Sequence, residues 1–303
     1  MSTTGPAGDP LGTFSVATRA TFGDESGPWL DSVPGLIAEL TSAWSVHPGE
    51  PRATDDRYVV PSERDGDRLD LELSYPDGWW AETTLAFETW GGDATLRLLE
   101  RDPRGVRLLE RSEPIPDESG DAGIRDACAL ARRLWVAPPD GVTSVAVEVR
   151  AWAAELPDRH TRAGRPYEPE LVRGAIDLFQ RLGPTQGDRV LLHGDLHLTS
   201  LALADDRRVL LGPRPLVGER EFDAASLLRD APGELILDLN EGRRRLQTRF
   251  EVLIDELGCN PTRLQGWAFA TAMDQAVWCA ENGDQTTGAT IVETARMIRA
   301  LEV

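Results

Sequence analysis

The stretch VLLHGDLHLTSLALADDRRVLLGPRPLVGE, residues 190–219, is the part of the chain that decides the fold. An apolar run ends in HGD at 193–195, two short apolar segments follow, and the second ends in GPR at 212–214. This order predicts a strand that leads into an exposed loop, within a β-hairpin over 190–212. A carboxylate placed directly after a strand is suited to orient or deprotonate an acceptor hydroxyl, so Asp195 is the first candidate catalytic residue.

Two antiparallel hairpins with a helix between them are predicted for residues 56–111. The segments RYVVPSE and DRLDLELS alternate in polarity around the turn sequence RDGD, and ATLRLLERD and GVRLLERSE do so around PRG. Between them, GWWAETTLAFETWGG has helical spacing and ends in two glycines, which favour the end of a helix. A further helix is predicted over 29–44, before the first hairpin.

The remainder of the chain is mostly helical by spacing. It follows EPIPDESGD, a polar, proline-rich link. The sequence therefore predicts an α+β protein with a flexible tail over 1–10, a sheet-rich N-lobe over 11–112 and a helical C-lobe over 113–303 that includes the hairpin 190–212. Helices are expected near 121–135, 168–183, 242–257, 261–281 and 286–301.

Composition narrows the classes of partner. The formal net charge of −19 disfavours nucleic acid and anionic lipid surfaces, whose phosphates would be repelled, and favours a cationic small molecule or a basic peptide. No apolar run approaches the roughly 20 residues of a membrane span. Three cysteines without paired spacing argue against a disulfide framework or a structural zinc site, and the N-terminus has no secretory pattern. A cytoplasmic protein is expected.

Several segments resemble one known family. HGDLH followed by LVGEREFDAASLLRD is similar to the aminoglycoside and hydroxyurea phosphotransferases, particularly their streptomycin-kinase-like branch. PWLDSVPGLIAEL, WAETTLAFETWGG and WAFATAMDQAVWCAENGD agree in the same order over nearly the whole chain. The resemblance implies a two-lobed, protein-kinase-like fold that binds ATP with magnesium in a cleft, and a small hydroxylated antibiotic against the helical lobe.

Part of the family pattern is kept. The family typically reads H-G-D-L-H-x-x-N and then D-P-K-x-L-V-G-x-x-x-F-D, which makes Asp195 the residue that orients the acceptor. His193, His197 and Asp223 match the pattern, and Arg214 stands for its lysine. Taken without the family, Asp195 is better explained as a loop residue that caps its own backbone, because Asp favours turns.

Other positions depart from the pattern. The asparagine that holds magnesium is replaced by Ser200, the second metal-binding aspartate by Gly212, and the strand lysine by Glu72, while its helix partner is kept as Glu82. A charge pair at about 4 Å is worth roughly 4 kcal/mol at an effective dielectric of 20, so Lys to Glu turns attraction for phosphate into repulsion of that order. These losses predict that no metal and no cofactor are bound.

The nucleotide-covering loop, which the family pattern places in GEPRATDDRYVV, departs as well, because Asp55 and Asp56 would face the phosphates. Arg207, Arg208 and Arg214 remain as displaced phosphate contacts if the chain does bind ATP and magnesium.

The remaining candidates each have a second interpretation. The resemblance implies that Asp274, Trp278 and Glu281 line the acceptor pocket; a solvated acidic face is the alternative. Asp223 is assigned to the substrate side with them, although a buried hydrogen-bonding brace for the loop is favoured over a reacting group. His193 and His197 are four residues apart, but without further ligands they are better explained by structural hydrogen bonds than by zinc.

Three functions remain open. The first is a catalytically impaired pseudokinase that binds a cationic small molecule, a basic peptide or a partner protein. The second is an active ATP-dependent phosphotransferase with rearranged metal ligands, which modifies an alcohol group of an antibiotic or secondary metabolite. The third is reuse of the fold in secondary metabolism, for example on a peptide.

Overall fold

The computed structural model describes residues 9–54, 57–115 and 121–303. The predicted tail over 1–10 lies almost wholly outside the described residues, as do Asp55 and Asp56. The chain forms two compact units. The first comprises Met1–Glu113 together with Leu203–Arg207, and the second comprises Pro114–Ala202 together with Arg208–Val303.

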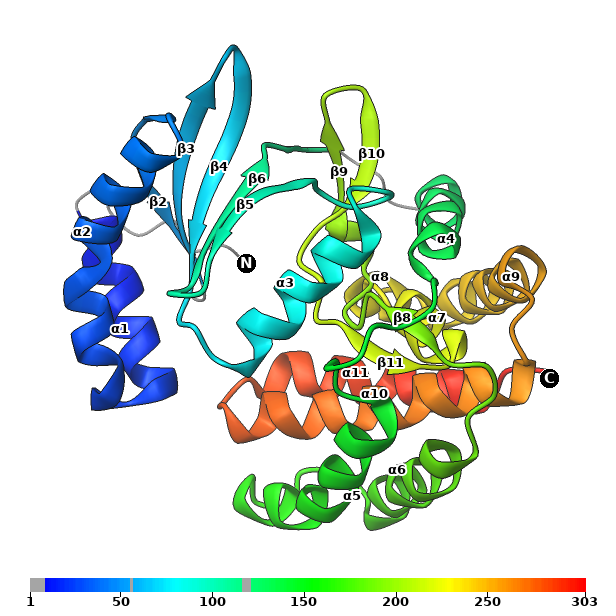
Figure 1. Cartoon of the computed structure of the whole chain (residues 1–303). Helices are drawn as coiled ribbons and strands as arrows, with labels where there is room; N and C mark the ends of the chain where they lie inside the picture. The colour runs from blue at the N-terminus through cyan, green and yellow to red at the C-terminus, as the bar shows by residue number, and fades with distance from the viewer. Residues whose placement is uncertain (1–8, 55–56, 116–120) are drawn as a thin grey trace. The chain divides into compact units, whose positions relative to one another are not determined.

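The first unit contains an antiparallel sheet in which β1, β3, β4, β6 and β5 lie in that order, with β2 paired to β3. Helix α1 lies against β2 and β3, and α3 lies against β5 (Figure 1). The helices and strands are α1 Pro10–Phe22, η1 Asp24–Ser26, α2 Gly27–Ala43, β1 His47–Pro48, β2 Arg52–Ala53, β3 Tyr58–Arg64, β4 Asp67–Leu73, α3 Gly78–Trp90, β5 Leu98–Asp102, β6 Val106–Glu110 and, at the boundary of the units, β7 Glu113–Pro114.

Both predicted hairpins of this unit are confirmed. Strand β3 turns into β4 through Asp65 and Gly66, whose φ angles of 56° and 91° fit the left-handed conformation of a tight hairpin turn. Alternation then places Leu69, Leu71 and Leu73 of β4 in the core. The helix over 29–44 is confirmed as α2, and the one in GWWAETTLAFETWGG as α3, which ends at the left-handed Gly91.

Helix α1 was not expected from the sequence. Its segment PLGTFSVATRATF is rich in threonine and β-branched residues, which have only modest helix propensity, and it buries only Phe14 and Thr18. Two features start the helix: Asp9 accepts the N–H of Gly12 at 3.0 Å, and Pro10 occupies the first turn. Packing of Phe14 in the core of the unit completes it.

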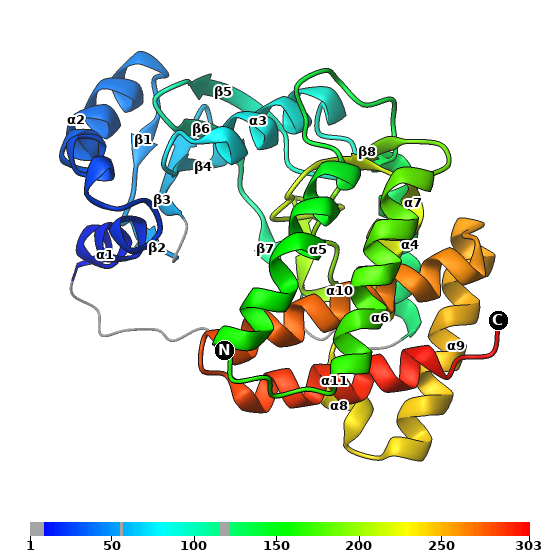
Figure 2. The ribbon, with the colours of Figure 1, turned by 90° about the horizontal axis from the view of Figure 1, so that it is seen from below.

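The second unit is organised around α10, which packs against α5, α6, α7 and α11 (Figure 2). The five helices expected from spacing are confirmed as α4, α6, α9, α10 and α11. The elements are α4 Asp121–Leu134, α5 Val145–Arg162, α6 Pro169–Leu182, η2 Gly183–Thr185, β8 Val190–Leu192, η3 Leu198–Ser200, β9 Leu201–Ala204, β10 Arg207–Leu210, β11 Leu216–Gly218, α7 Arg220–Leu228, α8 Pro232–Ile236, α9 Leu239–Leu257, α10 Pro261–Glu281 and α11 Gln285–Arg299.

The expected hairpin over 190–212 needs correction. Strands β9 and β10 form the hairpin, whereas β8 pairs with β11, with Leu191 opposite Val217. The tip Leu203–Arg207 groups with the first unit rather than with the helical one. Its Arg207 donates hydrogen bonds to the carbonyl of Gly92, at 3.0 Å, and to the carboxylate of Glu110. No local sequence pattern predicts the pairing of β8 with β11, because the β9–β10 hairpin separates the two strands along the chain.

None of the helices in the described ranges is both long and apolar enough to span a lipid bilayer.

Candidate functional site

The loop after β8 is fixed by its backbone. Gly194 has a φ of 79°, and a Cβ atom there would lie 1.8 Å from the carbonyl oxygen of Arg214. The N–H of Arg214 in turn donates to the carbonyl of His193 at 2.8 Å. Only glycine fits this close crossing of two backbones, so the HGD sequence follows from packing as much as from chemistry.

Asp223, on α7, binds the backbone of the same loop through hydrogen bonds. Its Oδ2 accepts the N–H of His193 at 2.8 Å and the indole N–H of Trp135 at 3.0 Å, and its Oδ1 accepts the N–H of Gly194 at 2.7 Å. The residue is 1% exposed. Asp223 is therefore a brace for the loop, the interpretation favoured from the sequence, and its assignment to the substrate side is corrected because the buried side chain has no surface with which to contact a substrate.

His193 is structural in this arrangement. Burial lowers its pKa, which favours the neutral ring, and its Nε2 lies 3.1 Å from the carbonyl oxygen of Leu211. The Nε2–H tautomer donates this bond, which leaves Nδ1 buried without a partner among the described residues.

Asp195 lies at the exposed end of a chain of charged groups. Its Oδ1 is 2.9 Å from Nε2 of His197, whose Nδ1 is 3.6 Å from Oδ1 of Asp230. Burial opposes protonation of His197, but hydrogen bonds to the two carboxylates outweigh it and raise the pKa of His197 to about 9. Burial also opposes ionisation of Asp195, and the His197 imidazolium outweighs it and lowers the pKa of Asp195. The loop thus presents an ionised carboxylate whose side chain is 43% exposed.

The positions that the family resemblance assigns to magnesium do not fit that ion. Ser200 supplies one hydroxyl, which donates to the carbonyl of Asp195 at 3.5 Å, and Gly212 supplies no side chain. Magnesium favours carboxylate oxygens, and within the described part of the chain no three His, Cys, Asp or Glu side chains gather closely enough to hold a metal ion.

In the first unit, Glu72 is neutralised by two arginines. It lies on β4 opposite Arg107 of β6, and both residues are about nine-tenths buried or more. Arg107 donates to Glu72 Oε1 through NH2 at 2.6 Å and Nε at 3.1 Å, and NH1 of Arg57 lies 3.3 Å from Oε2. Burial alone would raise the pKa of Glu72, but the two guanidinium groups outweigh it and lower that pKa.

This pairing corrects the expected electrostatics. Glu72 was expected to repel phosphate by roughly 4 kcal/mol as a bare charge; with two arginines bound to it, the carboxylate is instead part of an ion-paired cluster. Arg107 also lies 5.8 Å from the ring centre of Trp80 and 5.6 Å from that of Phe87, both on α3. Glu82 is half-buried on the same helix.

The phosphate contacts proposed from sequence are engaged elsewhere. Arg207 is bound to Glu110 and Gly92, and Arg208 pairs with Asp126 at 3.1 Å. Arg214 is exposed, and its charge contributes to the lowered pKa of Asp195.

On α10, the two predicted acceptor-side carboxylates are already paired. Arg159 of α5 bridges Asp274 at 2.7 Å and Glu281 at 3.1 Å, and Arg162 reaches Glu281 at 2.7 Å. Trp278, one turn from each of these acids, is 56% exposed. Neither partner is predictable from the sequence, because no helix is predicted over the residues of α5 and Arg159 lies 115 residues from Asp274.

One buried guanidinium connects this group to the loop. Arg229 follows α7, donates to the amide oxygen of Gln275, and is acted on by the charges of Asp195, Asp230 and Asp274. The structure therefore brings Asp195, His197 and Asp274 into one cluster. Neither Asp230 nor Arg229 was expected from the sequence, although both stand at the end of the quoted segment LVGEREFDAASLLRD.

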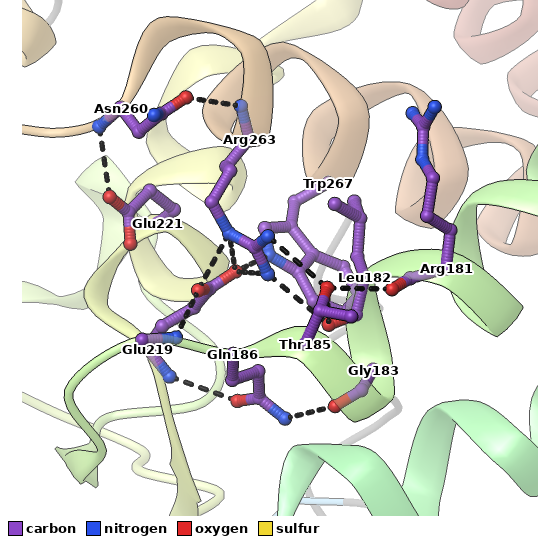
Figure 3. A network of polar contacts seen from close by, with 11 residues as sticks. Arg181, Leu182, Gly183, Thr185, Gln186, Glu219, Glu221, Asn260, Arg263 and Trp267 are labelled. Carbon is purple, nitrogen blue, oxygen red and sulfur yellow. Dashed lines mark hydrogen bonds and ion pairs between the residues drawn. The ribbon is translucent and has the colours of Figure 1, made fainter.

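A buried carboxylate anchors the start of α7 to α10 (Figure 3). Glu219 is 2% exposed, and it accepts bonds from Nε of Arg263 at 2.7 and 2.8 Å, from the indole of Trp267 and from the N–H of Gly187. Because α7 carries Asp223, this network also sets the position of the loop brace.

Comparison with known proteins identifies the family to which this chain is similar. Residues 48–283 match the family model described as aminoglycoside/hydroxyurea antibiotic resistance kinase. Streptomycin 6-kinases of Streptomyces glaucescens and Streptomyces griseus are 28% and 30% identical, over 94% and 86% of this chain and 95% and 87% of theirs. Hydroxyurea phosphotransferase of Kitasatospora aureofaciens is 29% identical over 89% of this chain and 80% of its own.

Solved structures show the fold. A choline kinase from Streptococcus pneumoniae aligns with a TM-score of 0.59 at 11% identity, over 88% of this chain and 99% of its own. An aminoglycoside phosphotransferase aligns with a TM-score of 0.58 at 13% identity, over 89% and 100%. The predicted family and the predicted α+β, kinase-like fold are confirmed.

Replacing His197 with Gln is expected to remove a pH-dependent part of the stability. Because the pKa of His197 is raised from 6.5 to about 9 on folding, its contribution is complete below pH 6.5 and is lost as the pH rises through 9. In the unmodified protein, this contribution of His197 to the free energy of unfolding, lost between pH 6.5 and 9, is at most about 3 kcal/mol. Urea unfolding between about pH 6 and pH 10 measures it. The exposed His47, replaced by Gln, is the control; an unchanged pH slope in both variants would exclude His197 as the source.

Replacing Glu72 with Gln is expected to destabilise the first unit by about 3–5 kcal/mol, because Arg107 would remain buried without its partner. Replacing both residues with Leu should recover most of that loss. The exposed pair Arg68–Glu113 is the control, since its disruption should cost less than about 1 kcal/mol. Denaturant unfolding measures the loss of folding free energy for each pair. Equal losses for the buried pair Glu72–Arg107 and the exposed pair Arg68–Glu113 would contradict the structural role given to Glu72.

Proposed function

The chain belongs to the aminoglycoside/hydroxyurea antibiotic resistance kinase family, and from that premise we propose that it is a pseudokinase member that does not transfer a phosphoryl group from magnesium-bound ATP. It keeps the loop that orients an acceptor and uses that loop to bind a cationic small molecule, a basic peptide or a partner protein. No cofactor takes part in this function.

The observation that carries the proposal is the residue chemistry at positions 200 and 212. A serine hydroxyl and a glycine replace the amide and carboxylate oxygens with which the family pattern recruits magnesium. Magnesium sites rely on carboxylates together with substrate phosphates, and the retained carboxylates near the loop, Asp195 and Asp230, are both paired with His197.

The groups left for a ligand favour a cation. Asp274 and Glu281 already hold Arg159, so the exposed carboxylate of Asp195 and the exposed face of Trp278 are the available contacts. A carboxylate and an aromatic face both attract ammonium and guanidinium groups. The formal net charge of −19 would also steer a cation toward the chain.

An active ATP-dependent phosphotransferase is the second candidate. The relatives are named as streptomycin 6-kinases and a hydroxyurea phosphotransferase, which favours catalysis over a silent site. The braced loop around Asp195 is complete, and Arg57 and Arg107 place guanidinium groups at Glu72, the position where the family lysine is missing. The comparisons support this candidate better, whereas positions 200 and 212 support the first.

We place either function in the cytoplasm, in antibiotic resistance or secondary metabolism. The three cysteines are buried and unpaired, which suits a reducing compartment, and the names of the relatives point to antibiotic modification.

Titration with ATP tests the pseudokinase directly. Isothermal calorimetry should show no increase in ATP affinity when magnesium is added. A variant that combines Ser200→Asn, Gly212→Asp, Glu72→Lys and Arg107→Glu should gain a magnesium-dependent response, since the last pair of changes restores the lysine while it preserves a buried ion pair. Asp is among the residues that tolerate the positive φ of 67° at position 212. Magnesium-dependent ATP binding by the unmodified chain would refute the proposal.

Phosphorylation assays with labelled ATP decide the second candidate. If the chain is active, streptomycin or hydroxyurea should be labelled, and Asp195→Asn should lower the rate by a factor of about 10²–10⁴, as expected for loss of a general base. Asp188→Asn, at a nearby exposed position, is the matched control. A rate that does not depend on Asp195 would remove this candidate.

A further inference from the structure

A hollow of about 320 Å³ lies between α6, α10 and α11 in the second unit. Figure 2 shows α10 and α11 side by side with α6 crossing them, and α10 packs against both of the others. None of the lining residues belongs to the segment 190–230 that carries Asp195, so the hollow is separate from the candidate site. Its volume lies at the lower end of the range of about 300–1,000 Å³ that small-molecule sites occupy.

Two glycines keep the hollow open. A Cβ atom on Gly174 of α6 would lie 3.5 Å from the ring of Phe269, and one on Gly266 of α10 would lie 3.2 Å from Leu178. A larger side chain at either position would therefore extend over Phe269 or Leu178. Half-buried Leu178 gives the hollow apolar surface, a suitable contact for a hydrocarbon or aromatic group, and Phe269, which is 3% exposed, adds a ring edge to the lining.

The rim of the hollow is basic, in contrast to the chain as a whole. Arg181 of α6 and Arg299 of α11 line it, with Asp177 as the single acid, so the hollow has one surplus positive charge in a chain of net charge −19. Within the described ranges neither arginine has a carboxylate at ion-pair distance. Arg299 lies 5.7 Å from the ring centre of Phe269, and Figure 3 shows the side chain of Arg181 extending away from the Glu219 network.

Helix α10 adds to the positive potential. Thr262 lines the hollow from the first turn of this 21-residue helix, where backbone N–H groups and the helix dipole favour an anion. The side chain of Asn260 caps the N–H of Arg263 at 3.1 Å. Because Pro261 has no N–H and Asn260 already accepts that of Arg263, the cationic side of the hollow is made mainly by the two guanidinium groups, while Leu178 and Phe269 make its floor apolar.

We propose that this hollow binds a small organic acid, with its carboxylate between Arg181 and Arg299 and its aromatic or aliphatic body on Leu178 and Phe269. Two guanidinium donors and an apolar floor match a singly charged amphipathic anion. The surplus positive charge disfavours the cationic ligand proposed for the Asp195 loop. The site is independent of phosphoryl transfer.

Calorimetric titration of the full chain with benzoate tests the site. Saturable binding with one site per chain is expected. Inorganic phosphate, which lacks the apolar body, and benzylamine, which carries the opposite charge on a similar body, should bind at least about tenfold more weakly. No saturable binding of benzoate, or equal binding of benzylamine, would overturn the proposal.

Variants of the lining residues test whether benzoate binds in this hollow. The double change Arg181→Gln and Arg299→Gln should weaken benzoate by about tenfold or more, whereas Arg173→Gln, which removes the same charge from the same helix outside the hollow, should not. Gly174→Leu should fill the hollow and abolish binding without lowering the melting temperature, since leucine is the better helix former. Benzoate affinity that survives both the double change and Gly174→Leu would place the binding elsewhere.

Discussion

The buried carboxylate of Asp223 fixes the loop on which every functional interpretation of this protein depends. It accepts the backbone N–H groups of His193 and Gly194 and the indole of Trp135, so a fully buried anion has three donors. Gly194 lies against the carbonyl of Arg214, so the two backbone segments cross closely and only glycine fits at position 194. The position of Asp195 therefore follows from its neighbours' hydrogen bonds and hardly from contacts of its own.

Buried and half-buried acids elsewhere in the chain are matched by arginines in the same way. Glu72 is held by Arg57 and Arg107, Glu219 by Arg263, and the two acids of α10 by Arg159. A buried ion pair is costly to break from one side, because the remaining charge stays desolvated. The net charge of −19 already includes these arginines, so the excess negative charge comes from acids other than the paired ones.

Glu72 explains how the first unit tolerates the loss of the family lysine. An isolated carboxylate on a buried strand would be strongly destabilising, but Arg107 lies directly opposite on the neighbouring strand and supplies two of its hydrogen bonds. The substitution therefore belongs to a self-consistent core. In the second unit, by contrast, Ser200 and Gly212 introduce no comparable partner, and they simply remove metal-binding oxygens.

Local patterns predicted much of the fold. The hairpins of β3–β4 and β5–β6 and the helices α2 and α3 follow from alternation, turn residues and glycine caps, which act over a few residues. Helix α1 was missed because its segment has weak propensity and is completed by the packing of Phe14. The pairing of β8 with β11 was missed because the partner strand lies beyond the hairpin that separates them.

The sequence by itself determined the family, the kinase-like fold, the loop that carries Asp195 and the chemistry absent at positions 200 and 212, since each depends on residue identity within a short motif. Only the tertiary structure decided which charges remain available. The arginines that neutralise Glu72 and Glu281 lie 35 and 122 residues away along the chain. Ion pairing depends on distance in space, which strand register and helix packing set and a linear pattern does not contain.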